Sequence, residues 1–285
     1  MTTDPEGTRP AFDDPLAYRR PATPVIQANG STSATAGTNV VPLGVDDMLI
    51  EAGTEVNRRK LLLASIRNRS EGRGLAQEIF DELAIAIVEG KLKPGDTIDS
   101  VGLARRFGTS RTPIREAIVE LERQGVVAVP PRRRPYIATP TPKQVRDIYD
   151  LRTSLYVLVS ELVVQYATSA DLADLKRWQD ALENDVAQGA VDDYFWHNVG
   201  FRNLEARISK NAELENMICG LGLRTLQFRH FSLSTPARIE RSVQDHRRLL
   251  RAYEERDAGL AASLNRALIQ AGFLAVERSG LLANG

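Results

Sequence analysis

The stretch that decides the fold reads Phe107-Gly108-Thr109-Ser110-Arg111-Thr112-Pro113-Ile114-Arg115-Glu116-Ala117-Ile118. Gly108 is expected to end a short preceding helix, because glycine reaches the left-handed conformation easily. Ser110 can cap the next helix, and Pro113 falls in its first turn, where the missing N–H costs little. The pattern therefore predicts two helices joined by a tight turn.

The second of these helices has an apolar face and a basic face. Arg111 and Arg115 lie one turn apart near its start, away from the centre of the apolar face. Because the N-terminal residues of a recognition helix reach base edges in the major groove, this arrangement fits a reader of DNA. Four apolar side chains follow helical spacing and are expected to pack inward: Ile114, Ala117, Ile118 and Leu121.

The charge of this region also favours nucleic acid, although the 285-residue chain has a formal net charge of zero. Between Ser100 and Arg134 there are eight arginines and three glutamates, a net charge of +5. Phosphate contact needs such a local positive patch. Arg132 to Arg134 stand between two short apolar segments, 126–129 and 136–138, which predicts a two-stranded wing with a basic tip. A turn whose arginines are only solvated is the alternative.

The run from Ala104 to Ile118, followed by Leu121-Glu-Arg-Gln-Gly125-Val-Val, resembles the winged helix-turn-helix of GntR-family transcriptional regulators. The helical remainder is similar to the FadR-type subfamily, whose all-α C-terminal FCD domain binds an effector. The resemblance implies that Arg111 and Arg115 contact bases or nearby phosphates. It also implies that three neighbours contact the DNA backbone: Thr109, Ser110 and Thr112. The predicted DNA-binding set further includes Arg105, Arg106, Pro113, Arg132, Arg133 and Arg134.

Two positions depart from the family pattern. Ser100-Val101 stands where many relatives carry a Glu-Arg pair that also touches DNA. The usual glycine of the wing is replaced within Arg132-Arg133-Arg134-Pro135, and we place Arg134 at the glycine position. We expect Arg134 to favour phosphate contact over close approach to the minor groove.

The length of the chain predicts two domains behind an N-terminal extension. Residues 1–70 are expected to be disordered or partly helical, since six of the fourteen prolines lie in the first 45 residues. Within them, residues 58–67 could form a basic helix, serving either as a tether or as a DNA-contacting arm. We assign residues 71–139 to the winged helix-turn-helix and residues 140–285 to an all-α domain, beyond a proline-rich linker.

The all-α domain is expected to be an antiparallel bundle of about six helices, which makes the whole fold mainly α. The core of such a bundle is a natural place for a small-molecule cavity. The apolar stripes that indicate the helices begin near Ile148, Leu172, Asp192, Leu214, Pro236 and Leu260.

Many FadR-type domains hold a divalent metal with an Asp or Asn and three histidines. On the family register, Asn198 takes the first place, Arg202 and His246 the next two, and Leu268 falls at or near the last. An arginine repels a cation and a leucine has no donor atom, so we expect no metal and no cofactor. A degenerate site at Asn198 and His246 is one alternative.

A second alternative metal site uses Asp193 and His197, which are four residues apart but about 140° of helix from the register face. His230 is the one remaining histidine and has no place in either set. A complete metal site is therefore not expected from this pair.

Without a metal, Arg202 becomes the candidate for direct, bidentate binding of a carboxylate effector. Arg152 matches an arginine common in this domain and would be a second contact. In the alternative, Arg202 forms a buried ion pair with Glu161 or another internal acid and binds nothing. The remaining candidates for lining the effector site are Tyr156, Asn198, Arg224 and His246.

These observations predict a DNA-binding transcriptional regulator, a repressor on family grounds, that a small organic acid controls. Its expected partners are a palindromic double-stranded operator and a second copy of the chain, with no membrane. A ligand-independent DNA-binding dimer with a purely structural helical domain is the alternative. The sequence shows no nucleophile–base pair, carboxylate dyad or phosphate loop, so we expect no enzyme. The single cysteine, Cys219, and the lack of an apolar run near ~20 residues favour a cytoplasmic, nucleoid-associated protein.

Overall fold

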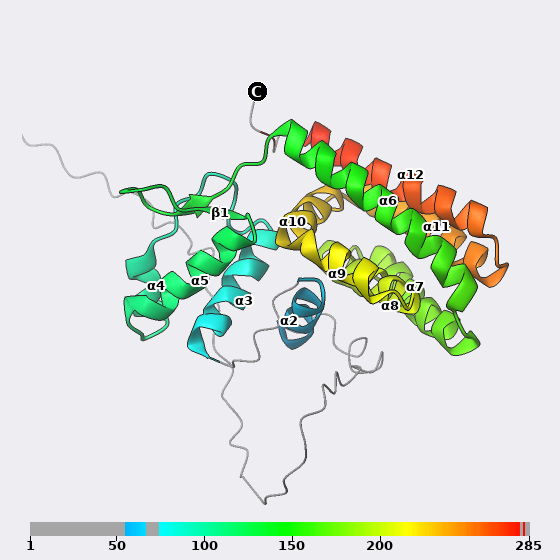
Figure 1. The fold of residues 1–285 in the computed structure, drawn as a ribbon, viewed down its shortest axis with the longest axis horizontal. Helices are drawn as coiled ribbons and strands as arrows, with labels where there is room; N and C mark the ends of the chain where they lie inside the picture. The colour runs from blue at the N-terminus through cyan, green and yellow to red at the C-terminus, as the bar shows by residue number, and fades with distance from the viewer. Residues whose placement is uncertain (1–54, 67–73, 280–281, 283–285) are drawn as a thin grey trace, which may run out of the picture. The chain divides into compact units, whose positions relative to one another are not determined.

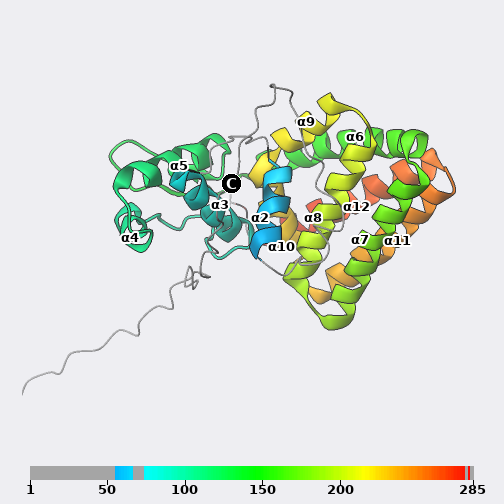
Figure 2. The same cartoon turned by 90° about the horizontal axis from the view of Figure 1, so that it is seen from below.

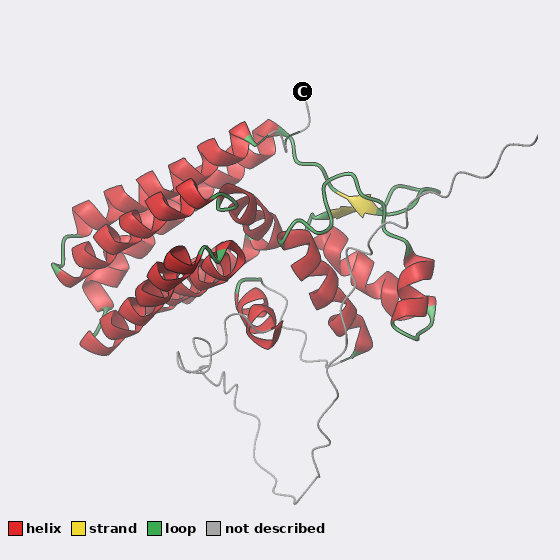
Figure 3. Ribbon diagram, turned by 180° about the vertical axis from the view of Figure 1, so that it is seen from behind, coloured by secondary structure: helices red, strands yellow, loops and turns green. Residues whose placement is uncertain are grey.

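The computed structural model describes residues 55–66, 74–279 and 282. Within these residues it contains eleven helices and two strands of two residues each, so the fold is mainly α, as predicted. Figure 1 shows the helices in chain order, and Figure 3 shows how little of the described chain is strand. The predictions for residues 1–54 and 67–70 lie outside the described residues.

Three helices and a hairpin occupy the segment assigned to DNA binding. They are α3 (Leu75–Val88), α4 (Ser100–Arg106), α5 (Arg111–Arg123), β1 (Val127–Ala128) and β2 (Tyr136–Ile137). The strands pair antiparallel, with Val127 opposite Ile137. Gly108, between α4 and α5, has a φ of 60°, the left-handed conformation expected there. Ser110 occupies the N-cap position of α5, but its side chain makes no capping hydrogen bond.

The apolar face of α5 is buried as predicted. Ile114 and Leu121 have no exposed surface, and Ala117 and Ile118 are almost fully covered. α5 packs on α3 and α4. This packing sets the helix so that its other face, which carries the arginines, is left exposed.

Seven helices follow the linker, one more than expected. They are α6 (Pro142–Tyr166), α7 (Ser169–Gln188), α8 (Val191–Ile208), α9 (Ala212–Gly220), α10 (Gly222–Ser232), α11 (Pro236–Glu254) and α12 (Ala258–Arg278). The stripe that predicted one fourth helix is split into α9 and α10. The break falls at Gly222, whose φ of 55° interrupts the right-handed helix. α6 and α12 lie side by side along their lengths (Figure 1).

Contrary to the expectation that no segment could span a membrane, α12 is long and apolar enough to cross a bilayer by length and composition. It is the one such helix in the described part of the chain. α12 packs along α6, and one side of it is buried, including Leu264, Leu268 and Ile269. We therefore interpret α12 as a core helix of the bundle.

The helix α2 (Glu55–Ala64) lies in the segment predicted to be partly helical. It contacts both α3 and α8, and Figure 2 shows it between them. Leu61 and Leu62 have no exposed surface. Arg58 donates to Glu89 at 2.6 Å and to Asp193 at 3.1 Å. Because this basic side chain is held by carboxylates of the protein, the contacts favour a packed helix over a DNA-contacting arm.

Candidate DNA-binding surface and effector cavity

The outward face of α5 presents the two arginines that the sequence singles out. Arg111 and Arg115 are exposed, and neither forms an ion pair in the described part of the chain. Ser110 and Thr112 beside them are also exposed, whereas Thr109 and Pro113 are partly covered. A shallow groove follows this face of the helix, lined by Thr112, Arg115, Glu116, Val119, Glu120 and Arg123. Free guanidinium groups on an exposed helix face are available to phosphates and base edges.

The wing carries the second group of exposed cations, Arg132, Arg133 and Arg134. The left-handed residue at its tip is Arg132, with a φ of 59°, and not Arg134. For a residue with a Cβ this conformation costs about 1–2 kcal/mol. Position 132 is therefore where the backbone conformation favours a glycine, two residues before position 134, which was inferred from the family pattern.

Arg105 and Arg106 differ although they are neighbours in the sequence. Arg105 is exposed, whereas Arg106 forms an ion pair with Glu82 of α3. The Arg106 guanidinium also lies 5.6 Å from the centroid of the Phe107 ring. Arg106 therefore links α4 to α3, and the Glu82 carboxylate partly neutralises its charge.

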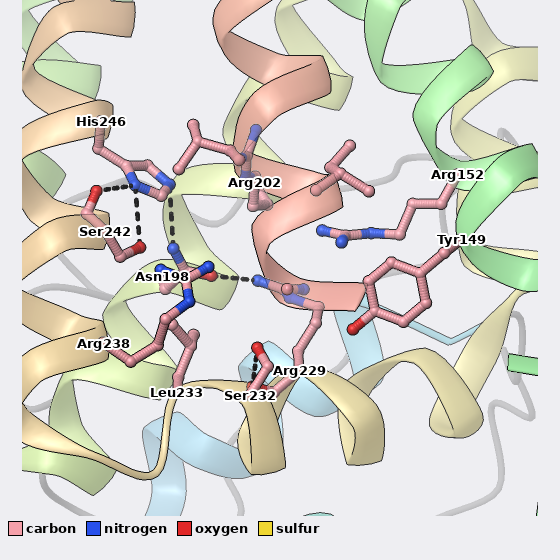
Figure 4. Close-up of a pocket in the computed structure, with 13 residues that line it drawn as sticks. Tyr149, Arg152, Asn198, Arg202, Arg229, Ser232, Leu233, Arg238, Ser242 and His246 are labelled. Carbon is pink, nitrogen blue, oxygen red and sulfur yellow. Dashed lines mark hydrogen bonds between the residues drawn. The ribbon is translucent and has the colours of Figure 1, made fainter. Parts of the chain in front are cut away.

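The helical domain holds a small cavity of about 30 Å³ that is partly open to solvent (Figure 4). Four arginines line it: Arg152 of α6, Arg202 of α8, Arg229 of α10 and Arg238 of α11. No Asp or Glu is among the residues that line it. The side chains that line the cavity therefore carry positive charge and no negative charge.

Arg202 has an internal counter-charge. Its Nη1 donates to Glu205 Oε2 at 2.9 Å and also to Asn265 Oδ1. Glu205 is fully buried, and Tyr253 donates its hydroxyl to the other carboxylate oxygen at 2.5 Å. Burial is the largest influence on the pKa of Arg202 and lowers it, but Glu205, Tyr156 and Tyr253 together outweigh burial, so the pKa is raised. The internal acid is therefore Glu205 and not Glu161, which is exposed.

Arg152 and Arg229 are almost fully buried, at 5 % and 6 % exposure, and form no ion pair in the described chain. The Arg152 guanidinium lies 5.1 Å from the centroid of the Tyr156 ring. Arg229 donates to Asn198 Oδ1 at 2.6 Å. Burial, and next to it the charge of Arg152, lowers the pKa of Arg229 to about 9. These two cations thus pay a desolvation cost with no carboxylate to offset it.

His246 is held as a neutral imidazole. Its Nδ1 donates to the backbone oxygen of Ser242 at 2.8 Å, so its Nε2 accepts from Asn198 Nδ2 at 3.0 Å. Burial lowers the pKa of His246 well below its usual value, and Arg202 acts in the same direction. His246 therefore orients the Asn198 amide, whose oxygen faces Arg229 (Figure 4).

These residues do not fit a divalent cation. Asn198 and His246 are hydrogen-bonded to each other, and Arg202 and Leu268 line the same cavity. Positive guanidinium groups repel a metal ion. Across residues 55–66, 74–279 and 282, no three His, Cys, Asp or Glu side chains are grouped to hold one.

The alternative metal pair is not assembled either. Asp193 is bound by Arg58, and His197 forms a hydrogen bond with Asp185. His230 forms one with Asp192 at 3.0 Å. Each of these three side chains therefore has a partner within the protein.

Four of the six residues predicted to line the effector site meet at the cavity: Arg152, Asn198, Arg202 and His246. Tyr156 does not line it, but its ring lies against the guanidinium groups of Arg152 and Arg202, each 5.1 Å from the ring centroid. Tyr156 therefore supports the cavity from behind.

Arg224 is not at the cavity, which corrects the prediction for this residue. Its side chain packs against Gly125 instead, and its nearest atoms lie 3.2 Å from the position that a Cβ on Gly125 would take. Arg229 lies five residues later on α10, a rotation of about 140°, and reaches the cavity instead. The sequence does contain a pattern that could have indicated Arg229. It is the one cation in the otherwise uncharged run from Thr225 to Phe231. Arg238 and Tyr149 were also missed.

Two families match the chain. The gntR family of bacterial regulatory proteins matches residues 75–137, which hold the helix-turn-helix and wing, and the FCD domain matches residues 147–271. The chain belongs to the GntR family of transcriptional regulators. The combination of a GntR head with an FCD domain fits its FadR-type subfamily.

Several curated GntR regulators resemble this one over most of their length. The HTH-type regulator YdhC of Bacillus subtilis is 29% identical over 181 residues, 63% of this chain and 81% of that protein. McbR of Escherichia coli is 26% identical over 185 residues, 64% of this chain and 84% of that protein. The gluconate operon repressor of Bacillus subtilis is 25% identical over 181 residues, 61% and 70% of the two chains. These relatives are transcriptional regulators, so this GntR protein is not an enzyme.

The solved structure of E. coli McbR/YncC supports the fold. It matches with a TM-score of 0.64 at 23% identity and covers 73% of this chain and 99% of that chain. The helix α2 of this GntR regulator precedes both of the segments that the family models match.

Proposed function

We propose that this GntR regulator is a repressor that binds a palindromic double-stranded operator as a homodimer. In this proposal a small organic acid enters the cavity of the FCD domain and releases the DNA. Arg111 and Arg115 read base edges or phosphates, and the wing arginines contact the phosphate backbone. The protein works in the cytoplasm at the nucleoid, where bacterial operators lie.

The observation that carries this proposal is that α10 contributes to the cavity and also packs on the DNA-binding domain. On one face, Arg229 and Ser232 line the cavity. On another face, Arg224 lies against Gly125, two residues beyond the end of α5. The Phe231 ring lies 3.6 Å from the position that a Cβ on Gly90 would take, two residues beyond the end of α3. α10 and α3 are in contact.

This placement suggests how an effector controls DNA binding. An anion that draws Arg229 into new contacts changes the preferred position of α10. Because α3 and α5 end against α10, the preferred placement of the DNA-binding head changes as well. The effector then acts by binding one of the two placements more tightly, which is the requirement for allosteric control.

Within the cavity we assign the carboxylate contact to Arg229 and Arg152, because Arg202 is already neutralised by Glu205. Planar guanidinium groups bind carboxylates through two parallel hydrogen bonds. Asn198 and His246 hold Arg229 in position, and Tyr156 supports Arg152. One relative is named for the gluconate operon, which is consistent with an acid as effector.

The experiment measures operator affinity with and without small acids. An operator is selected from random double-stranded DNA with the purified protein, and its binding is followed by fluorescence anisotropy. We expect Arg115→Ala to abolish specific binding and one or more acids to weaken wild-type binding. Arg229→Gln should bind the operator but resist release. If no acid changes the affinity, the protein is a ligand-independent DNA-binding dimer.

A further inference from the structure

The formal charge of the cavity is the starting point. Arg202 and Glu205 neutralise each other, and His246 is neutral. Arg152, Arg229 and Arg238 remain as cations without an ion pair among the described residues. Asp245, whose charge acts on Arg238, is paired with Arg248. The residues that line the cavity therefore carry an uncompensated charge of about three positive units.

The unmet hydrogen-bonding groups of the cavity are donors. Tyr149 is 2 % exposed, and its hydroxyl has no partner among the described residues. Burial raises the pKa of Tyr149, so the hydroxyl keeps its proton. Arg238 likewise has Nε and Nη1 buried without a partner. Buried polar groups are normally satisfied, so these donors indicate a missing acceptor.

The unpaired cations and the Tyr149 hydroxyl come from three helices and meet from different sides. Arg152 and Tyr149 belong to α6, Arg229 to α10, and Arg238 to α11. Figure 4 shows Arg229 between the Arg152 side and the Arg238 side. A ligand that satisfies all three cations must therefore offer acceptors at more than one end.

We propose that this cavity binds a small anion with at least two negative charges, held by Arg152, Arg229 and Arg238 without a metal ion. The proposal rests on the proposed function, because it names the chemical class of the effector. A monoanion leaves two buried positive charges uncompensated, whereas a dianion or trianion neutralises most or all of the excess. The arginines take the place of the cation that a metal would supply to a carboxylate.

Dicarboxylates, tricarboxylates and phosphate compounds share this chemistry, and a binding experiment separates them. The protein is dialysed against EDTA and transferred to a buffer without multivalent anions. The probes are succinate, citrate and inorganic phosphate, compared with acetate and lactate at equal ionic strength. We expect a multivalent probe to raise Tm by about 2–8 °C and the monoanions to have little effect. Added divalent metal should change nothing.

Substitutions test which side chains hold the anion. Arg229→Gln and Arg152→Gln should weaken binding of the active probe by about 10- to 100-fold. Neither should lower the Tm of the ligand-free protein, because each removes a buried charge that has no counter-charge. Arg202→Gln should lower that Tm, since it leaves Glu205 unpaired. Arg247→Gln, an exposed position on α11, is the control that should change neither property.

The proposal would be overturned by monoanions that stabilise as well as the multivalent probes, by no stabilisation from any multivalent probe, or by a Tm shift that persists in Arg229→Gln. A shift that requires added metal would also contradict it. The operator assay distinguishes this failure from that of the proposed function. If lactate or another monoanion releases the operator, the regulator is effector-controlled but the charge requirement is wrong.

Discussion

Two groups of arginines in this GntR regulator show how position decides what the same side chain does. On α5 and the wing, Arg111, Arg115 and Arg134 are exposed and unpaired within the described chain. In the FCD domain, Arg152 and Arg229 are almost completely buried. Water stabilises the charges of the exposed arginines, whereas no carboxylate in the described chain neutralises Arg152 or Arg229.

The difference indicates two kinds of anion recognition. An exposed arginine meets a phosphate with a modest net gain that depends on salt. A buried arginine without a counter-charge has already lost its hydration, so an arriving anion meets a pre-desolvated partner in a low-dielectric site. We therefore expect the first group to govern DNA affinity and the second to govern effector binding, with little exchange of roles.

Removing the counter-charge of Arg202, a third buried arginine of the cavity, should have the largest effect. Glu205→Ala leaves Arg202 buried and unpaired, and we expect the free energy of unfolding to fall by about 3–5 kcal/mol. Denaturant unfolding measures this change. Glu161→Ala, an exposed position on α6, should change stability by less than about 0.5 kcal/mol. Equal effects of the two substitutions would break the contrast between buried and exposed charges.

A substitution in the exposed group should affect DNA and not stability. Arg111→Ala is expected to weaken operator binding by about 1–3 kcal/mol, because one base or phosphate contact is lost. Tm should stay unchanged, since the side chain makes no ion pair in the described chain. Anisotropy and thermal unfolding of the same preparation test both statements. A drop in Tm with intact DNA binding would assign Arg111 a structural role.

The neutral histidine beside the buried group predicts a pH effect. The pKa of His246 is lowered in the folded protein, so below about pH 6.5 only the unfolded chain binds this proton. Stability should therefore fall as pH decreases below 6.5, by at most about 1.4 kcal/mol per pH unit from this group. The measurement compares wild type with His246→Gln between pH 5.5 and 7.5. Parallel curves would show that His246 titrates normally.

The smallest effect is expected at the wing. Arg134→Gly removes one exposed cation, so the slope of log affinity against log salt should decrease by about 1. Sequence preference should shift toward closer minor-groove contact if Arg134 keeps the wing at the phosphates. Arg251→Ala on α11, where the exposed Arg251 pairs with Glu255, is the matched control and should leave the slope unchanged. Unaltered affinity and preference in Arg134→Gly would exclude Arg134 from the DNA interface.

Much of the DNA-binding head follows from local sequence. The tight turn at Gly108, the buried face of α5 and its exposed arginines depend on residues close together in the chain. Helical spacing alone separates the side that packs from the side that is solvated. The wing is also local, although only the structure shows that Arg132, and not Arg134, adopts the left-handed conformation.

The cavity depends on contacts between distant segments. The sequence predicted four residues that do meet at the cavity: Arg152, Asn198, Arg202 and His246. It also predicted Arg224, whereas Arg229 is the residue of α10 that lines the cavity. The break at Gly222 sets the rotation of α10, and a rotation of about 140° separates a residue at the cavity from one at the DNA-binding head. The partner of Arg202 was left open between Glu161 and other acids until packing selected Glu205.

The sequence by itself determined the mainly α fold, the helix-turn-helix and the basic character of its exposed face, because these follow from periodicity and turn residues. Only the tertiary structure decided which arginines are neutralised and which are not. Charge compensation depends on which helices pack together and at what rotation, and no local pattern encodes that.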